Sequence, residues 1–410
     1  MSQQGRELTN RKPPRTLRQA TRLAWRKCKR FLEFLLATAF DRLILAGLPI
    51  RSVADCAVLH VELLGDYVLW RPYGRALVQH LRQQGRQVYL IVEDSAATLA
   101  ACDFHGCHLV SVSRQRVMGD LGYRARTLRR LRRLHVEQTY LASCPREGLT
   151  HDAIVGALGA PALGFEAVFS DRPWPDRAWN RRRYASGLVA DTGWTHKNLP
   201  HCRMLEALGV DSSSVCPLPP QIADKPDTDT RENYWILAPG ASHTGRRWPV
   251  SRFAAVANWL GHLHPDWICV LVGSAAERGL AKTLEAQLSC KVENRVGATS
   301  VRELQTWIAG AKLVLGNDSA AGHFAAALGV PAVVAVGGGH HGRCYPYAPD
   351  ASPVLLLPTV VTTVMECFHC DWNCRYPVAA GAPFRCLEQI DVASVCDAVS
   401  RAIDQHPERR

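Results

Sequence analysis

Short apolar segments alternate with amphipathic ones along most of this chain, and this alternation restricts the possible fold more than any other feature. The apolar runs 56–61, 88–92 and 108–112 predict strands, and the segments 73–84 and 96–102 between them predict helices. Strands that are separated by helices form parallel sheets, because each connection must return to the starting end of the sheet. The sequence therefore predicts a parallel sheet covered by helices on both faces.

The same alternation begins again after a polar, proline-rich stretch. Residues 216–233 are predicted to link a first lobe, residues 51–215, to a second lobe, residues 234–410. The second lobe has predicted strands at 235–238, 267–272, 313–315 and 332–336, and predicted helices at 251–262, 276–288, 301–308 and 323–328. We expect two doubly wound α/β lobes with a ligand cleft between them, at the carboxyl ends of the strands.

Positive charge is concentrated in residues 1–50, which we treat as a separate segment. The formal net charge of the chain is +12, and this segment holds eleven basic and three acidic side chains. Apolar and basic residues from Thr16 to Leu48 recur with helical spacing and predict a basic amphipathic helix. Such a helix suits an anionic membrane surface, and a helix docked on the lobes with its charges in water is an equal alternative. The rest of the chain is nearly balanced in charge, which argues against a nucleic-acid partner.

The cysteines and the distribution of charges indicate a cellular compartment. Fifteen cysteines are scattered along the chain, and no N-terminal stretch has the pattern of a secretory signal. The apolar stretch 31–50 contains Glu33, Asp41 and Arg42, whereas a membrane-spanning helix needs about 20 residues with few or no charges. We expect a cytoplasmic protein, and the basic helix makes peripheral attachment to the inner face of the cytoplasmic membrane an alternative.

Two loops after predicted strands of the second lobe carry residues that suit a nucleotide. The first, residues 239–242 with Arg246 and Arg247 behind them, combines small residues with two guanidinium groups whose paired donors match phosphate oxygens. The second places Glu277 after a strand, where a carboxylate can accept hydrogen bonds from ribose hydroxyls. Taken alone, Glu277 is more often a charge that stabilises a helix N-terminus.

A third loop, residues 316–323, lies between a predicted strand and a predicted helix. Asp318 and Ser319 stand at its capping positions, and the free N–H groups of the helix start can bind a diphosphate. An ordinary helix cap is an equal interpretation of this loop by itself. Three such loops from successive strand ends of one lobe favour a nucleotide site.

The order of these motifs resembles glycosyltransferase family 9, whose best-known members are the ADP-heptose:lipopolysaccharide heptosyltransferases. The resemblance extends over about residues 55–400 and comprises Gly65-Asp66, Pro-Gly-Ala-Ser with Arg-Arg-Trp-Pro, Gly273 with Glu277, Gly297-Ala-Thr-Ser300, and Asn-Asp-Ser with His323. It implies a GT-B fold of two Rossmann-like lobes. It also implies a nucleotide-sugar donor in the C-terminal lobe, an acceptor in the N-terminal lobe and no metal requirement in catalysis.

The resemblance implies a role for each matching residue. Asp66 is the implied catalytic base, and a carboxylate between the lobes can take the proton of an acceptor hydroxyl. From the sequence pattern alone, Asp66 is more often a helix N-cap than a base. The implied donor-binding residues are Ser242, Arg246, Arg247, Glu277, Asp318, Ser319, Ala320 and His323, and the implied acceptor-binding residues are His60 and Gly65.

These implications define an expected reaction. Asp66 would deprotonate a hydroxyl of a saccharide or glycolipid of lipopolysaccharide-core type, which would attack the anomeric carbon opposite the nucleotide and invert it. The sugar is expected to be a heptose from ADP-heptose. Arg246 and Arg247 would stabilise the departing diphosphate.

The chain departs from the usual pattern of the family at three positions. His60 and Arg246 stand where Arg and Lys are usual, and Ala320 stands where a Gly follows Asp-Ser. The Cβ of Ala320 is expected to restrict the approach of a phosphate or to change the backbone angle. The alternative function is therefore a nucleotide-sugar-binding protein of the same fold with lost or altered transferase activity.

Four cysteines near the C-terminus have a spacing that suits a structural zinc ion. They are Cys367, Cys370, Cys374 and Cys386. Family 9 members often carry a similar group, by resemblance, and unligated thiols in a packed loop are the alternative. With the arginines of 124–133, this group also suggests a basic nucleic-acid adaptor, but no aromatic residues for base stacking are interleaved there. The arginines are expected to form a solvated helix face or to attract a phosphorylated glycolipid.

Overall fold

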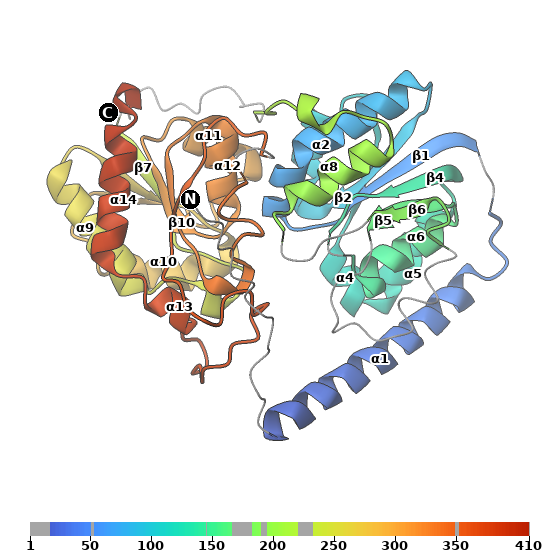
Figure 1. Ribbon diagram of the computed structural model, residues 1–410, viewed down its shortest axis with the longest axis horizontal. Coiled ribbons are helices and arrows are strands. Elements are labelled where there is room, and N and C mark those ends of the chain that lie inside the picture. Colours follow the sequence, from blue (N-terminus) through green and yellow to red (C-terminus); the bar gives the residue numbers. More distant parts are fainter. Residues whose placement is uncertain are drawn as a thin grey trace, which may run out of the picture.

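The protein consists of two α/β lobes that lie side by side (Figure 1). The computed structural model describes residues 17–50, 53–144, 146–165, 183–189, 195–219, 233–348 and 352–409. Most of the predicted linker, residues 220–232, lies outside the described residues, as do residues 1–16 of the basic segment.

Six parallel strands form the sheet of the N-terminal lobe, in the order β3-β2-β1-β4-β5-β6. Their bounds are Val53–His60 for β1, Val88–Glu93 for β2, His108–Val112 for β3, Val136–Leu141 for β4, Ala162–Phe165 for β5 and Gly187–Val189 for β6. The chain runs outward in opposite directions from the central pair β1 and β4. In open α/β sheets, ligands bind at the carboxyl ends of the strands at such a point.

The sheet of the C-terminal lobe has an equivalent arrangement, β12-β11-β10-β7-β8-β9. Its strands are β7 (Tyr234–Ala238), β8 (Ile268–Leu271), β9 (Val292–Asn294), β10 (Val314–Asn317), β11 (Ala332–Ala335) and β12 (Thr359–Val361). Every residue of β7, β10 and β11 is buried, because helices cover both faces of the sheet. The two Rossmann-like lobes predicted from the sequence are thus confirmed.

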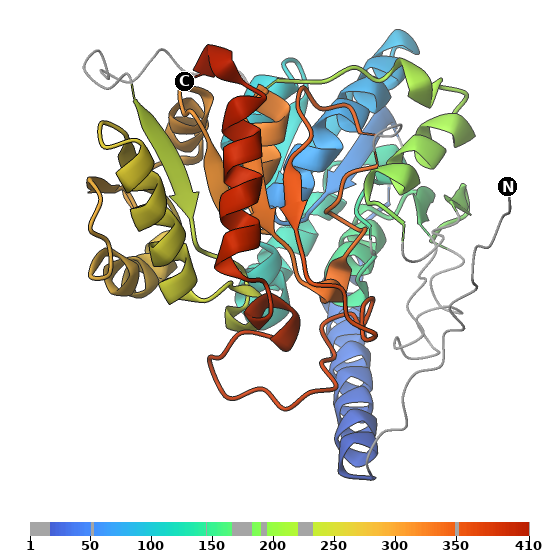
Figure 2. The same ribbon diagram turned by 60° about the vertical axis from the view of Figure 1, so that its left-hand side comes forward.

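Helices flank both sheets (Figures 1 and 2). Those of the N-terminal lobe are α2 (Leu64–Gln83), α3 (Ala97–Asp103), α4 (Arg114–Gly119), α5 (Leu121–Arg132), α6 (Ala153–Leu158) and α8 (Asn198–Ala207). Those of the C-terminal lobe are α9 (Val250–Leu263), α10 (Arg278–Glu285), α11 (Val301–Ala309), α12 (Ala320–Leu328), α13 (Arg385–Glu388) and α14 (Val392–Asp404).

Helix α2 is longer than the sequence predicts. The pattern predicts a helix over 73–84, whereas α2 begins at Leu64. Proline normally occurs at the start of a helix, so Pro72 favours a helix that begins near this position. In the structure, however, Pro72 lies inside α2 and is buried. The early start places Asp66 in the first turn of α2.

The two lobes share an apolar core where α2 faces α12. Val68 and Trp70 from α2 belong to the same cluster of buried side chains as Phe324 from α12. The absence of a side chain at Gly65 permits the contact, since a Cβ at this position would lie only 3.0 Å from Cδ2 of His323. The first turns of α2 and α12 therefore lie against each other.

Helix α1 (Leu17–Leu45) packs on α5 and α6 and extends beyond the N-terminal lobe (Figures 1 and 2). Its contact corrects the expectation that all arginines of 124–133 lie on a solvated face, because Arg124 and Arg132 are buried. Arg124 pairs with Asp41 of α1, and Arg132 donates to the carbonyl of Gly156 at 3.1 Å. Among the described helices, none combines the length and the apolar character that crossing a membrane requires.

Candidate active site

Asp66 lies where loops of the two lobes meet. It follows the carboxyl end of β1 and occupies the first turn of α2, whose N-terminal partial positive charge favours a carboxylate. The charges of Asp66 and of Asp318 in the C-terminal lobe both act on the ring of His323. The structure thus brings the expected base next to the loop that follows β10.

The Asp66 carboxylate forms an ion pair with Lys197, the residue just before α8. Lys197 Nζ donates a hydrogen bond to Oδ1 of Asp66, and the two side chains are only 12% and 16% exposed. Burial by itself raises the pKa of Asp66, but the Lys197 ammonium outweighs burial and lowers the pKa below its ordinary value. Burial likewise opposes the charged form of Lys197, and Asp66 reverses this effect, so that the pKa of Lys197 is raised. The pair is therefore fully ionised at neutral pH.

The segment that carries Lys197 also connects the two lobes. The backbone N–H of Lys197 donates to the carbonyl of Arg343 at 2.8 Å, and Nε2 of His196 is 3.1 Å from the carbonyl of Cys344. Both carbonyls belong to the loop after β11 in the C-terminal lobe. A change in the lobe contact would therefore move Lys197 relative to Asp66. Lys197 was not predicted from the sequence, because a single lysine does not show that its partner is Asp66, 131 positions away.

A second buried carboxylate, Glu62, lies close to Asp66. Burial and the negative charge of Asp66 raise the pKa of Glu62 to about 7. Arg114 approaches it at 3.4 Å and His151 at 3.7 Å. Glu62 therefore changes its protonation near neutral pH. Glu62 was not predicted as a site residue, because no sequence pattern indicates that a glutamate after a strand is buried.

His60, expected to contact the acceptor, is a buried ring in the N-terminal lobe. It stacks on Trp70 with ring centroids 4.4 Å apart, and only 2% of the residue is exposed. Burial lowers the pKa of His60 well below its ordinary range, with a further contribution from His201. His60 is therefore neutral and packs against Trp70, and its contact with an acceptor stays a prediction.

Arg246 joins two of the loops that the sequence analysis assigns to the donor. Its Nη1 donates to Oγ of Ser242 at 3.1 Å, and its Nη2 donates to Oδ2 of Asp318 at 3.0 Å. The guanidinium also lies over the ring of Trp372, 4.7 Å from the ring centroid. Arg247 is turned toward its own loop and donates to the carbonyl of Ala241 at 3.2 Å. The loops after β7 and β10 thus form one polar surface around Arg246.

Asn317, buried at the end of β10, fixes the relative position of these loops. Its Nδ2 donates to the carbonyl of Pro239 at 2.7 Å, and its Oδ1 accepts from the backbone N–H of Trp248 at 2.8 Å. A buried amide that uses both its donor and its acceptor in this way holds the two strand ends in register. The sequence analysis included Asn317 in the motif without assigning it this role.

Glu277 combines the two roles considered for it. Its Oε2 accepts hydrogen bonds from the N–H and the hydroxyl of Ser274, at 2.7 and 2.9 Å, which is the contact of a helix cap. The rest of the carboxylate lies over the end of β7, since a Cβ on Gly240 would be 1.8 Å from Oε1. Among the described residues, none donates a hydrogen bond to Oε1. This oxygen remains free to accept from a ligand at the strand ends.

Ala320 is the first residue of α12, and Ser319 is its N-cap. The Ser319 hydroxyl makes no capping hydrogen bond, so it is available to a ligand at the helix start. Ala320 is not among the residues with a positive φ angle, which shows that its backbone does not require glycine. An altered backbone angle relative to proteins with glycine at this position stays a prediction. Crowding by its Cβ remains a prediction.

His323, the last expected donor-binding residue, is buried in α12. Its Nδ1 is 2.6 Å from the hydroxyl of Tyr347, and its ring stacks on Tyr345 with centroids 4.5 Å apart. Burial lowers the pKa of His323 to about 4. It is therefore a neutral ring in the first turn of α12, on which the charges of both Asp66 and Asp318 act.

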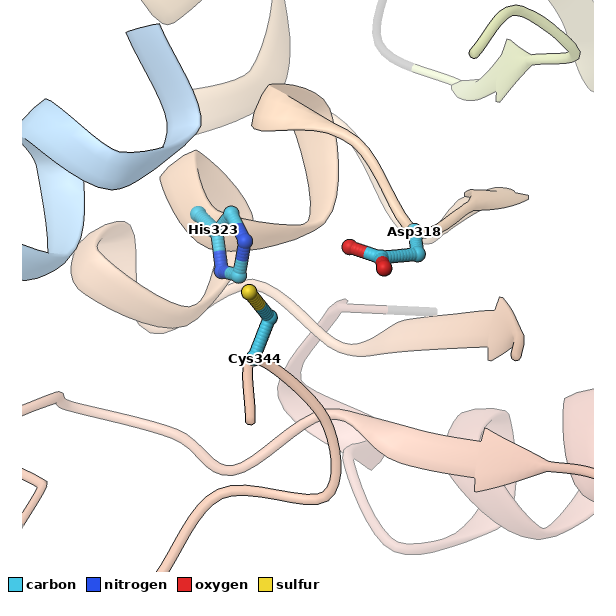
Figure 3. Close-up of side chains that lie close together, drawn as sticks. All are labelled: Asp318, His323 and Cys344. Carbon is cyan, nitrogen blue, oxygen red and sulfur yellow. The ribbon is translucent and has the colours of Figure 1, made fainter. Parts of the chain in front are cut away.

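Asp318, His323 and Cys344 form a cluster whose possible ligand atoms lie within 4.8 Å of one another (Figure 3). This spacing suits a metal ion, but two of the three groups already have partners: Asp318 binds Arg246, and His323 binds Tyr347. Lys197 also lowers the pKa of His323, which places a second positive charge nearby. A cation would have to compete with Arg246 and Lys197, so the chemistry of this site favours an anionic ligand.

The four C-terminal cysteines lie in the loop between β12 and α13 and in α13 itself. All are free thiols, and the burial of Cys370 raises its pKa to about 11. Their sulfur atoms do not form a group at metal-ligand spacing, unlike the cluster of Figure 3. The loop instead supplies Trp372 to Arg246, and Oδ1 of Asp371 is 2.8 Å from Nε2 of His340. This contact between the cysteine-rich loop and the expected diphosphate site could not be predicted from the sequence.

Comparison with known proteins agrees with this arrangement. Residues 212–367 match the sequence profile of "Glycosyltransferase family 9 (heptosyltransferase)". No curated protein matches the sequence. Among solved structures, a family 9 glycosyl transferase from Veillonella parvula is similar with a TM-score of 0.63 and 16% identity, over 86% of this chain and 98% of that one.

Two Escherichia coli enzymes are similar over comparable lengths. ADP-heptose LPS heptosyltransferase II has a TM-score of 0.57 and 17% identity, over 86% of this chain and 99% of its own. Heptosyltransferase WaaC, solved with ADP, has a TM-score of 0.54 and 16% identity, over 87% of this chain and 98% of its own. The iron-containing glycosyltransferase TibC is also similar, with a TM-score of 0.53 and 15% identity over 88% of this chain and 81% of its own. The fold and the profile match together identify this chain as a glycosyltransferase of the GT-B fold that matches family 9 over residues 212–367.

Proposed function

We propose that this protein transfers a heptose from ADP-heptose to a saccharide of lipopolysaccharide-core type, with inversion at the anomeric carbon. The observation that carries the proposal is the position of Asp66, which meets the loop of Asp318 and Arg246 across the contact between the lobes. The names of two similar structures support the choice of donor, since E. coli heptosyltransferase WaaC was solved with ADP and with ADP-2-deoxy-2-fluoro heptose.

The donor would bind at the strand ends of the C-terminal lobe. Arg246 and the N–H groups at the start of α12 would bind the diphosphate. The nine residues of α12 give its N-terminus a partial positive charge, and the Ser319 hydroxyl at the N-cap makes no capping hydrogen bond. Oε1 of Glu277 would accept a hydrogen bond from a ribose hydroxyl. As the bond to the sugar breaks, negative charge grows on the diphosphate and these donors stabilise it.

The acceptor hydroxyl would lie beside Asp66, which removes its proton as the oxygen attacks the anomeric carbon. A base with a lowered pKa is weak, so the contact with Lys197 must loosen for Asp66 to act. A bound diphosphate offers the Lys197 ammonium a second anionic partner. Donor binding would in this way both supply the sugar and release the base.

We also assign the reaction to the cytoplasm. All fifteen cysteines are described, and none forms a disulfide, which supports a reducing compartment. The predicted structural zinc of the cysteine-rich loop stays a prediction, and no step of the proposed reaction depends on it.

A transfer assay with ADP-heptose and a heptose-accepting core saccharide tests the function directly. Wild-type protein should release ADP and add one heptose to the acceptor, which mass spectrometry detects. Asp66→Asn should lower kcat by ~10²–10⁴-fold while ADP binding is nearly unchanged. Binding of ADP-heptose without transfer by the wild type would instead establish the alternative, a nucleotide-sugar-binding protein.

A further inference from the structure

The C-terminal half of helix α1 is attached to the N-terminal lobe by one side. Asp41 accepts two hydrogen bonds from the guanidinium of Arg124, at 2.6 and 2.5 Å, and Ile44 is buried against the N-terminal lobe. Arg129 donates to the carbonyl of Ile44 at 3.1 Å. These contacts fix the C-terminal half of α1 and define which side of the helix faces the lobe.

The opposite side carries a row of large apolar side chains exposed to solvent, which we call the outer stripe. It consists of Trp25, Leu32, Leu36 and Leu43, which are 66%, 56%, 63% and 74% exposed. At 3.6 residues per turn, their spacing keeps all four within about 20° of one line along the helix, which extends over roughly 27 Å. Asp41 and Ile44 lie on the other side of the axis, so the docking of α1 directs the outer stripe away from the lobe.

Basic side chains flank the outer stripe. The Lys29 ammonium lies 5.7 Å from the centroid of the Trp25 ring and forms a loose ion pair with Glu33 at 3.8 Å. Arg42 is exposed on the other flank of the stripe, whereas Arg30 is exposed on the side of the helix that carries Asp41. The acidic residue Asp41 is neutralised by Arg124 and contributes no free negative charge. The solvent side of α1 is therefore apolar along its centre and basic at its margins.

We propose that the outer stripe docks α1 flat on an anionic lipid bilayer. A helix that lies in the interface buries its apolar row among the acyl chains and places Lys and Arg beside the lipid phosphates, and tryptophan is enriched at this depth. The N-terminal part of α1 projects beyond both lobes, so a flat surface can reach it without meeting the sheets (Figure 2). Charge favours the bilayer over a second copy of the chain, because an α1 pair would bring two basic helices together.

Flotation of the full chain with vesicles tests this proposal. Wild-type protein should float with vesicles that contain about one-third phosphatidylglycerol and at least tenfold less with pure phosphatidylcholine, and about 1 M salt should weaken the binding. The double variant Leu32→Gln/Leu36→Gln should bind at least tenfold more weakly. Lys29→Gln/Arg42→Gln should lose most of the preference for phosphatidylglycerol.

A matched control is Leu263→Gln/Leu355→Gln, which changes two leucines of similar exposure, 55% and 52%, in the C-terminal lobe. The control should float like the wild type, and circular dichroism should show that all variants are folded. Failure of the wild type to float, or equal losses in the control, would overturn the proposal. A wild type that is dimeric and a stripe variant that is monomeric would assign the outer stripe to a second copy instead. None of these outcomes depends on the transferase assay.

Discussion

Asp66 and Lys197 form a buried ion pair between the first turn of α2 and the segment before α8. The carboxylate is the expected base of the N-terminal lobe, and the backbone of its partner is bound to the C-terminal lobe through Arg343. The protonation of the base therefore depends on how the two lobes meet.

Removing the lysine should shift the pH dependence of the reaction. In Lys197→Met the ammonium no longer opposes the effect of burial, and the pKa of Asp66 rises. Because Asp66 acts as a base only when ionised, the acidic limb of the kcat/KM profile should move to higher pH, with a several-fold loss of rate at pH 6 relative to pH 8. Lys197→Arg keeps the charge and should restore the acidic limb. A profile that keeps its shape and falls by one factor at every pH would contradict this role.

Arg246 should contribute strongly to diphosphate affinity. Arg246→Ala removes a charge-assisted donor and should weaken ADP binding by roughly 1.5–3 kcal/mol, measured by calorimetry. Arg401→Ala is a matched control, since Arg401 is exposed on α14 of the same lobe. Arg246→Lys keeps the charge but not the paired donors, so its loss should be intermediate. Equal losses in Arg246→Ala and Arg401→Ala would mean that the diphosphate binds elsewhere.

Ala320→Gly should separate ligand binding from folding. The backbone of Ala320 is helical, so glycine adds only chain entropy to the unfolded state and should cost about 0.4–1 kcal/mol of stability. If the Cβ crowds a phosphate, ADP should bind more tightly. Ala393→Gly, at an exposed position in the first turn of α14, should lose similar stability without changing ADP affinity. An Ala320→Gly protein with unchanged ADP affinity would rule out crowding by this Cβ.

Glu62 should make the stability of the protein depend on pH. Its pKa is raised from 4.5 to about 7 in the folded protein, so the folded state holds a proton that the unfolded state has released between these values. The free energy of unfolding should therefore fall as pH rises through this window, by on the order of 1–3 kcal/mol. Glu62→Gln cannot ionise and should flatten the dependence in urea unfolding at pH 5 and pH 8. The same slope in both proteins would assign the effect to other groups.

Sequence patterns that extend over a few residues were sufficient to predict the individual loops of the site. Residues 239–247 and 316–323 each follow a strand of one parallel sheet, and the carboxyl ends of such strands lie at the same edge. Arg246 and Asp318 could therefore be predicted to meet. The start of α2 at Leu64 could not be predicted, because the burial of Pro72 inside a helix depends on the packing of both lobes.

The two parallel sheets and the loops at their strand ends follow from local sequence patterns, since apolar periodicity and turn residues act over a few positions. The surroundings of Asp66 and Arg246 depend instead on how distant segments pack in the folded protein. The Lys197 ammonium, the burial of Glu62 and the Trp372 ring come from segments far apart in the chain, and their effects on charge depend on distance and solvent exclusion. Those quantities exist only once the lobes have packed together.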